Sequence, residues 1–377
     1  MNRLRCANVC VLVLFALVAT AAAGNFLVYF GTYTNALSRG IYVARLDADT
    51  GKLFTPELAV ATPSPCFLAV SPNGKFLYAA NSIPSFAGEK GGAVSAFAID
   101  RASGKLNLLN QTASGGTGPC HVSVDATGKV LLVADYGSGS VKSIPLNADG
   151  GFGDGGSVFQ LHGGSVNASR QSGPHAHFIT TDPSNHFVLA CDLGTDKVMV
   201  YKLADGKLTP NDPPFATVPP GSGARHLAFS RDGRFVHIIN EMACTITTFA
   251  WDADSGKLEL VETVSALPPD VAVQNTFTAA EILTSGNFVY ATVRGHDSVS
   301  VFAVDEKSGR LTLVQNISAG GKVPRGLGID PTGRWLITAN QKSDNAVEFG
   351  IDAATGKLSS TGQELKIGSP VDVKFVK

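Results

Sequence analysis

The sequence predicts an all-β protein, a seven-bladed β-propeller of four-stranded antiparallel blades, from two repeated patterns and one divided copy. The first pattern is an acidic or polar residue, a short spacer, then glycine, a basic residue and leucine. Clear copies begin at residues 47, 100, 252, 305 and 352, and weaker ones at 147 and 204. Aspartate and glycine favour tight turns, so each copy predicts the turn between the third and fourth strands of a blade.

The second pattern is an apolar strand, a turn such as SPNGK, and a second apolar strand that ends in a polar residue. Complete copies begin at residues 66, 120, 177, 225, 278 and 325. The copies lie about 47 to 57 residues apart, and repeats of this kind are typical of propeller blades stacked around an axis. Each copy therefore predicts the first two strands of a blade, joined by a tight turn.

The seventh copy is divided between the two ends of the chain. SPVDVKFV at the C-terminus resembles the first strand of the pattern, and FLVYFGTYT near the N-terminus resembles the second. Pairing of these two segments in one blade would close the ring. We therefore predict a single propeller domain over residues 24–377.

Residues 1–23 are predicted to be a secretory signal peptide. Arg3 and Arg5 precede the apolar run VLVLFALVAT, and three alanines at 21–23 fit a small-residue cleavage site. A membrane anchor is the alternative, although the apolar run is short for a span of about 20 residues. We expect the mature protein to be exported, periplasmic or secreted, and no later segment is expected to span a membrane.

Composition narrows the classes of partner. The 377 residues carry a formal net charge of −1, and only 16% of them are charged. The chain therefore lacks the excess of basic residues that attracts nucleic acid. The four cysteines beyond residue 23 lack a CxxC spacing and are expected to be buried thiols: Cys66, Cys120, Cys191 and Cys244. We therefore expect no nucleic-acid partner and no cysteine-bound metal. We also expect no other metal, no cofactor, and a monomer or weak dimer.

Ionisable residues are predicted to gather on one face of the ring. In an antiparallel hairpin, the start of the first strand lies beside the end of the second, away from the turn. Arg225-His226 and Asn240-Glu241 flank one such hairpin. Equivalent positions in the other copies hold Cys66, Cys120, His121, His175, His177, Asp192, Arg294, His296, Arg325, Asn340 and Gln341. A polar, concave mouth with convergent ionisable groups is a candidate site.

Structural roles remain open for part of this set. Asn81, Asp135, Asp192 and Asn340 recur at equivalent positions, so an alternative interpretation has them capping strand ends; His121 is alternatively a structural histidine and Arg325 a clamp between blades. Other members depart from the repeat consensus with groups that are costly to bury. These are Arg225, Glu241, Arg294 and the His175/His177 pair, for which we favour a functional role.

Several long segments also resemble a known family. GPCHVSVDATGKVLLVADYGSGSV, GPHAHFITTDP, GARHLAFSRDGRFVHIINE, RGHDSVSVF and PRGLGIDPTGRWLITANQKSDN are similar to the seven-bladed β-propeller lactonases, over essentially the whole mature chain. That family includes bacterial propeller-type 6-phosphogluconolactonases and fungal 3-carboxy-cis,cis-muconate lactonising enzymes. The resemblance implies catalytic roles for His175 or His177, Arg225, Glu241 and Arg294. The chain departs from the family pattern at Ala224, Val293 and Gly326.

The predicted chemistry is metal-independent hydrolysis of a sugar δ-lactone, phosphorylated or not. Glu241 or a histidine of the 175/177 pair would act as the base that activates water. Arg225 and Arg294 would bind the substrate anion or the developing oxyanion. Substrate contacts are expected from His121, Asp192, His226, Asn240, Glu281, His296, Arg325, Asn340 and Gln341.

Two other functions stay open at the level of sequence. One is a non-catalytic propeller that binds a carbohydrate or a protein at the same mouth, because propellers serve many functions. The other is a muconate-type cycloisomerase that uses the same arginines. A covalent acyl-enzyme is not expected, since the chain has no GxSxG motif.

Overall fold

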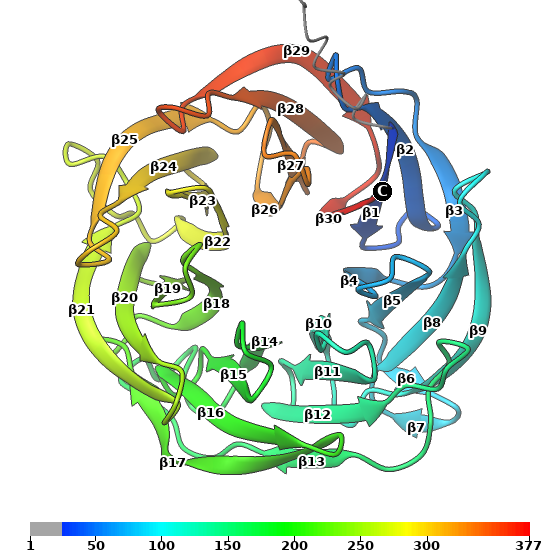
Figure 1. Ribbon diagram of the computed structural model, residues 1–377, viewed down its shortest axis with the longest axis horizontal. Helices are drawn as coiled ribbons and strands as arrows, with labels where there is room; N and C mark the ends of the chain where they lie inside the picture. The colour runs from blue at the N-terminus through cyan, green and yellow to red at the C-terminus, as the bar shows by residue number, and fades with distance from the viewer. Residues whose placement is uncertain (1–24) are drawn as a thin grey trace, which may run out of the picture.

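The computed structural model describes residues 25–377, which form seven four-stranded antiparallel sheets arranged as blades around a central axis (Figure 1). Six blades follow one another along the chain, and the seventh combines both ends of the described segment. In every blade the strands run in order from the axis to the outer rim. The predicted all-β, seven-bladed propeller is confirmed.

In each of the six consecutive blades, the strands follow chain order from the axis outward. The first two comprise β4 (Pro65–Val70), β5 (Phe76–Asn81), β8 (Ala93–Ile99) and β9 (Leu106–Ala113), then β10 (Pro119–Val124), β11 (Val130–Asp135), β12 (Ser140–Pro145) and β13 (Ser157–Gln160). The next two comprise β14 (Ala176–Thr181), β15 (Phe187–Asp192), β16 (Lys197–Ala204) and β17 (Lys207–Thr217), then β18 (Ala224–Phe229), β19 (Phe235–Asn240), β20 (Thr245–Asp252) and β21 (Lys257–Ser265). The last two comprise β22 (Thr278–Ser285), β23 (Phe288–Arg294), β24 (Ser298–Val304) and β25 (Leu311–Ser318), then β26 (Pro324–Ile329), β27 (Trp335–Asn340), β28 (Asn345–Ile351) and β29 (Leu358–Lys366).

The ring closes through the divided blade. Its strands, from the axis outward, are β30 (Pro370–Val376), β1 (Asn25–Thr32), β2 (Gly40–Asp47) and β3 (Glu57–Ala61). β30 pairs antiparallel with β1, from Val376 opposite Leu27 to Pro370 opposite Thr32. The predicted closure by the two ends of the chain is therefore confirmed. The predicted boundary at residue 23 lies outside the described residues.

The glycine-containing repeats form the predicted turns between third and fourth strands. In the clear copies the aspartate side chain accepts hydrogen bonds from the backbone N–H groups two and three residues later, as at Asp47 and Asp305. The following glycine adopts a left-handed conformation, with φ of 73° at Gly51 and 72° at Gly309. Glycine reaches this region without a Cβ clash, which explains why the repeat places it there.

Hydrophobic packing joins each blade to the next. Within residues 25–377, the seven clusters of buried apolar side chains each span the boundary between neighbouring blades. Phe26 and Val28 of the divided blade, for example, pack with Ile337 and Ala339 of β27. The stability of the ring therefore comes largely from contacts between sheets, which is where apolar surface is removed from water.

Two smaller features complete the fold. A short hairpin, β6 (Ser85–Phe86) and β7 (Glu89–Lys90), is inserted between β5 and β8 and was not predicted. The four cysteines in residues 25–377 are free thiols, of which Cys120 is half-buried and the others are buried. No helix in this part of the chain has the length and apolar character that a membrane crossing requires.

Candidate functional site

Every innermost strand carries an irregularity near its start. In five blades one residue is inserted between two regular pairs of the first and second strands: Cys66, Cys120, His177, Arg225 and Arg325. In the divided blade the extra residue is Val371, and in the remaining blade the irregularity falls at Ala280 and Glu281. These are β-bulges, which interrupt the alternation of side chains and redirect them.

The bulge explains how consecutive residues contribute to one site. In a regular strand, neighbouring side chains point to opposite faces of the sheet. In β18, however, Arg225 donates to the Ala280 carbonyl oxygen of one adjacent blade, and His226 contacts His177 of the other. Both side chains thus reach inner strands of neighbouring blades. In β18 the bulge thus provides two ionisable side chains, Arg225 and His226, where a regular strand would offer one.

The mouth of the ring holds a cavity of about 360 Å³. Its walls come from the starts of first strands, the segments after second strands, and one loop: Tyr33, Ser82, Gly118, Cys120, Tyr136, Gly137, Arg170, His177, Glu241, Arg294 and Arg325. This size is suited to a small organic ligand. Five ionisable side chains of this wall, His177, Glu241, Arg170, Arg294 and Arg325, thus share one cavity.

Glu241 is the centre of the charge cluster. One of its carboxylate oxygens accepts a hydrogen bond from Arg170 at 2.7 Å, and the other accepts from Arg225 at 3.0 Å and pairs with Arg294 at 2.9 Å. Burial by itself would raise the pKa of Glu241, but Arg294 and Arg225 hold the pKa well below its usual range. The carboxylate is therefore ionised and fully engaged, which makes it a poor proton acceptor.

The surrounding guanidinium groups exceed the carboxylates. Arg294 also donates to two backbone carbonyls, those of Thr278 and Ala279. Burial, followed by the charge of Arg294, lowers the pKa of Arg225 to about 9, so this group remains protonated at neutral pH. Four guanidinium groups against one carboxylate leave an excess of positive charge at the mouth.

Of these four guanidinium groups, that of Arg325 has no carboxylate partner among residues 25–377. Its guanidinium donates to the Tyr33 hydroxyl at 3.4 Å and lies 5.7 Å from the centre of the Tyr33 ring. Both side chains line the cavity. An unpaired, half-buried guanidinium on a cavity wall is suited to bind an anionic group of a ligand.

His177 is the imidazole that lines the cavity. Burial, and then the charge of Arg225, keeps the pKa of His177 well below its usual range, so the ring is neutral at pH 7. Its Nδ1 lies 3.2 Å from Nε2 of His226, while its own Nε2 has no hydrogen-bond partner among the described residues. A neutral imidazole with a free nitrogen in a cavity is a candidate base.

The other predicted base, His175, lies elsewhere. Its ring stacks on Tyr136 with centroids 4.4 Å apart, and its Nδ1 bonds the Tyr136 carbonyl oxygen at 2.9 Å. It is not part of the cavity wall. Of the predicted pair, the geometry favours His177.

A layer of buried side chains closes the ring beneath the cavity. His121 is sandwiched between Phe67 and Phe178, with ring centroids 4.1 and 4.0 Å away. Burial, and then His226, keeps the pKa of His121 well below its usual range. His121 and His226 therefore lie beneath the cavity and not on its wall, and the same holds for Glu281, which bonds His226.

The remaining predicted substrate contacts are turned toward the protein. Asp192 accepts hydrogen bonds from the backbone of His175 and Gly194 and from the Thr195 hydroxyl. The other side chains bond near their own strand ends: Asn240 to Thr245 and Thr247, Asn340 to Thr338 and the Ala319 carbonyl, and His296 to Ser298. Gln341 is half-buried and, like these, lies outside the cavity wall.

Cys120 is exposed to the same cavity but is unsuited to nucleophilic attack. Its thiol donates to the carbonyl oxygens of Ala176 and His177 at 3.5 Å. Burial raises the pKa of Cys120 far above its usual value, so the thiol is protonated at neutral pH. The site therefore favours attack by water and not by a cysteine.

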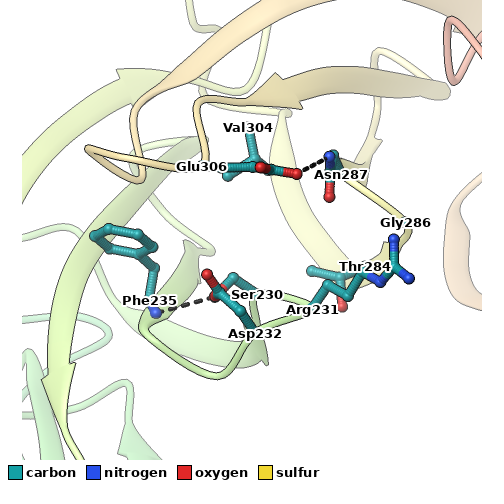
Figure 2. A pocket seen from close by; sticks show the side chains of 9 residues that line it. All are labelled: Ser230, Arg231, Asp232, Phe235, Thr284, Gly286, Asn287, Val304 and Glu306. Carbon is teal, nitrogen blue, oxygen red and sulfur yellow. Dashed lines mark hydrogen bonds between the residues drawn. The ribbon is translucent and has the colours of Figure 1, made fainter.

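A second pocket lies at the opposite, turn end of two blades (Figure 2). It is lined by Ser230, Arg231, Asp232, Phe235, Thr284, Gly286, Asn287, Val304 and Glu306. Its acidic groups are already engaged, Asp232 with Arg234 and Glu306 with Asn287. Its wall holds no histidine, so it lacks the imidazole base found at the mouth.

Sequence reasoning missed four polar residues near the mouth. Arg170 lies in the loop after β13, where the repeat provides no equivalent position. Tyr33 directly follows β1, the second strand of the divided blade, and so occupies the position that Glu241 occupies after β19. Asp372 and Lys374 lie on β30 and bond each other beneath the cavity at 2.5 Å. The latter pair had a signal, since both charges interrupt the apolar strand SPVDVKFV.

The fold and the site together define a β-propeller enzyme whose pocket opens at the mouth of its ring. A family model described as Lactonase, 7-bladed beta-propeller matches residues 27–375. The chain therefore belongs to the seven-bladed β-propeller lactonase family, as its sequence motifs indicated.

Individual relatives cover nearly the whole chain. A 6-phosphogluconolactonase of Bacillus subtilis (strain 168) is 36% identical over 352 residues, which are 93% of this chain and 99% of that protein. A 6-phosphogluconolactonase of Formosa agariphila is 30% identical over 347 residues, 90% of this chain and 96% of that protein. The solved structure of a periplasmic gluconolactonase of Pseudomonas aeruginosa matches with a TM-score of 0.86 and 32% identity, covering 94% of this chain and 99% of that one.

Proposed function

We propose that this protein hydrolyses the δ-lactone of a sugar acid in the cavity at the mouth of the ring. The observation that carries the proposal is the neutral His177 imidazole, whose free Nε2 shares a cavity with Arg294 and Arg325. A base and positive groups on one small cavity are what water attack on an ester carbonyl requires. The names of the relatives support the same reaction class.

His177 is the proposed base, and Glu241 is the proposed organiser of the arginines. The carboxylate of Glu241 is held ionised by three guanidinium groups, so it has little tendency to accept a proton. Its role is to keep Arg225 and Arg294 in place against their mutual repulsion. Of the two kinds of base that the sequence left open, we therefore favour the imidazole.

The reaction then proceeds by direct attack of water. His177 Nε2 takes a proton from water as the oxygen bonds to the carbonyl carbon, and the carbonyl electrons move to its oxygen, which a guanidinium group stabilises. Collapse of this intermediate breaks the ring C–O bond, and the proton on His177 passes to the departing alkoxide. The product is an open hydroxy acid that ionises in water.

The excess of positive charge favours an anionic lactone over a neutral one. Arg325 has no carboxylate partner in the described part of the chain, and with Tyr33 it would bind a phosphate or carboxylate of the substrate. Phosphorylated sugar lactones occur in the cytoplasm, whereas the N-terminal segment predicts export. A carboxylated sugar lactone satisfies both the charge of the mouth and an exported location.

Export itself remains part of this proposal. The predicted signal peptide, residues 1–23, lies outside the described residues, and the periplasmic location of the Pseudomonas aeruginosa relative supports it. Mass spectrometry of the protein purified from an exporting bacterial host tests it. Removal of the first 23 residues is expected, and a full-length protein retained in the membrane would contradict it.

The lactonase proposal is tested with purified mature protein and three lactones: glucono-δ-lactone, its 6-phosphate and a carboxylated sugar lactone. Opening is followed by acid release in weakly buffered solution, against the spontaneous rate. We expect acceleration with all three and a higher kcat/KM for the two anionic lactones. No acceleration with any of them would contradict hydrolysis and favour a binding role or cycloisomerisation instead.

A further inference from the structure

Three buried side chains form a continuous hydrogen-bonded chain beneath the cavity. His177 Nδ1 lies 3.2 Å from His226 Nε2, and His226 Nδ1 lies 2.8 Å from a carboxylate oxygen of Glu281. The three residues are only 4%, 1% and 3% exposed. The chain thus begins at the imidazole on the cavity wall and ends at a carboxylate inside the ring.

The hydrogen-bond directions follow from the partners. The Glu281 oxygen that faces His226 also accepts a hydrogen bond from the Ile282 backbone N–H at 3.1 Å, so it acts as an acceptor and the proton lies on His226 Nδ1. Neutral His226 then has a lone pair on Nε2, which accepts from His177 Nδ1–H. His177 is left with its lone pair on Nε2, the nitrogen without a protein partner among the described residues.

The three residues come from three successive blades. They lie on β14, β18 and β22, innermost strands that contact one another in this order around the ring. His177 and Glu281 lie within bulges and His226 directly follows one. The alignment of these three hydrogen-bonded side chains therefore depends on the same β-bulges that direct side chains to the mouth of the ring.

We infer that Glu281 and His226 are positioning residues that hold His177 with Nε2 unprotonated and stabilise the charge it acquires when it takes a proton from water. This inference rests on the proposed function. It replaces the substrate-binding role predicted for His226 and Glu281, since neither lines the cavity. The arrangement has the logic of a nucleophile-assisting triad, in which a buried carboxylate orients an imidazole, extended here by a second imidazole.

Other charged groups also face these three side chains. His177 lies near Arg225, Glu241 and Arg325. His226 lies near those three groups, Lys374 and His121, and Glu281 lies near Lys374, Arg225 and Arg325. The positive groups oppose protonation of the imidazoles, whereas Glu241 favours it. Burial raises the pKa of Glu281, and the charges of Lys374 and Arg225 oppose that shift. The ionised carboxylate at the end of the hydrogen-bonded chain adds negative charge that offsets the positive groups.

Kinetics of Glu281→Gln test the charge while keeping an acceptor for His226. We expect kcat to fall by about 10- to 100-fold with KM within about twofold, and the acid limb of the kcat/KM–pH profile to move to lower pH, because loss of the carboxylate makes His177 less basic. Glu348→Gln is the matched control, since Glu348 is also buried but lies on β28. An unchanged profile, or a loss confined to KM, would overturn the inference.

A spectroscopic measurement tests the chain without relying on turnover. In protein labelled with 15N-histidine, the His177 resonances are assigned by their loss in His177→Asn. We expect His177 to carry its proton on Nδ1 in the wild type and to exchange between both tautomers in His226→Phe, which removes the acceptor. His177 protonated on Nε2 in the wild type would overturn the inference. A protein with the expected tautomer but no lactonase activity would contradict the proposed function alone.

Discussion

The mouth and the turn end of the ring offer a direct comparison, since each holds a pocket and charged side chains. At the turn end, Asp232 pairs with Arg234, and their side chains are 41% and 56% exposed. At the mouth, the Glu241 and Arg225 side chains are 7% and 2% exposed. Water screens the first pair, so it contributes about 0–1 kcal/mol, whereas the second cannot be rearranged without a large electrostatic cost.

The comparison shows what distinguishes a functional pocket in this fold. Carboxylates at the turn end either form exposed pairs, as Asp232 does, or, like Asp125 and Asp182, are buried and accept hydrogen bonds from the backbone of their own turns. At the mouth, Glu241 and Arg225 are buried, three further guanidinium groups are half-buried, positive groups outnumber negative ones, and a neutral imidazole lies beside them. Burying more positive than negative charge lowers the stability of the protein. Anion binding and proton transfer at this site explain why such an arrangement is kept.

The largest expected effect is that of Glu241→Gln. The substitution leaves Arg225 and Arg294 buried without their shared carboxylate, so we expect a loss of about 3–5 kcal/mol in the free energy of unfolding. Activity is expected to fall by at least about 1000-fold, since the arginines lose their positions. Chemical denaturation and lactone hydrolysis measure the two effects.

The matched variant at the turn end is Asp232→Asn, which should change stability by less than about 0.5 kcal/mol and leave activity unchanged. Equal effects of the two substitutions would break the distinction between the two ends.

A loss of activity without a comparable loss of stability is expected for His177→Asn. Removal of the base should lower kcat/KM by about 10²- to 10⁴-fold, because general base catalysis contributes about that much. His186, an exposed histidine at a turn, provides the control, and His186→Asn should retain wild-type kinetics. Wild-type activity in His177→Asn would remove this residue from the mechanism.

Substrate preference should change in Arg325→Gln. We expect KM for the anionic lactones to rise by about 10- to 100-fold, in line with the loss of a charge-assisted hydrogen bond. The ratio of kcat/KM for the anionic lactones to kcat/KM for neutral glucono-δ-lactone should then fall. Arg231→Gln, in the second pocket, is the control. A preserved preference would place the anion-binding group elsewhere.

The smallest expected effect for a single residue concerns stability at acid pH. Burial holds the pKa of His121, His177 and His226 well below the unfolded value of about 6.5. Their contribution is fully present above that value and is lost as the pH falls toward the folded pKa, because only the unfolded chain takes up the protons. Each should add about 1.4 kcal/mol per pH unit to the slope of unfolding free energy below about pH 6.5.

His121→Phe isolates one of these contributions, because Phe178 and Phe67 already surround the position. Urea unfolding at several pH values should show a slope shallower by about 1.4 kcal/mol per pH unit than that of the wild type. An identical slope would mean that His121 is not buried in its neutral form.

Much of the site was accessible from the sequence. The hairpin pattern placed His177, Arg225, Glu241, Arg294 and Arg325 at one end of the ring, and all but the deeply buried Arg225 line the cavity. The same argument also selected Asp192, Asn240 and Asn340, whose side chains instead bond to their own strand ends. Position along a strand predicts which end of the ring a residue occupies, but not which way its side chain turns.

The sequence by itself determined the blades, their turns and the closure of the ring, because strand alternation and aspartate–glycine turns are local properties that repeat along the chain. Only the tertiary structure decided that Arg170 reaches Glu241 from a loop, and that His177, His226 and Glu281 align across three blades. Hydrogen-bond direction, burial and the pKa shifts that follow depend on distances between residues about 50 to 70 positions apart, and no local pattern encodes them.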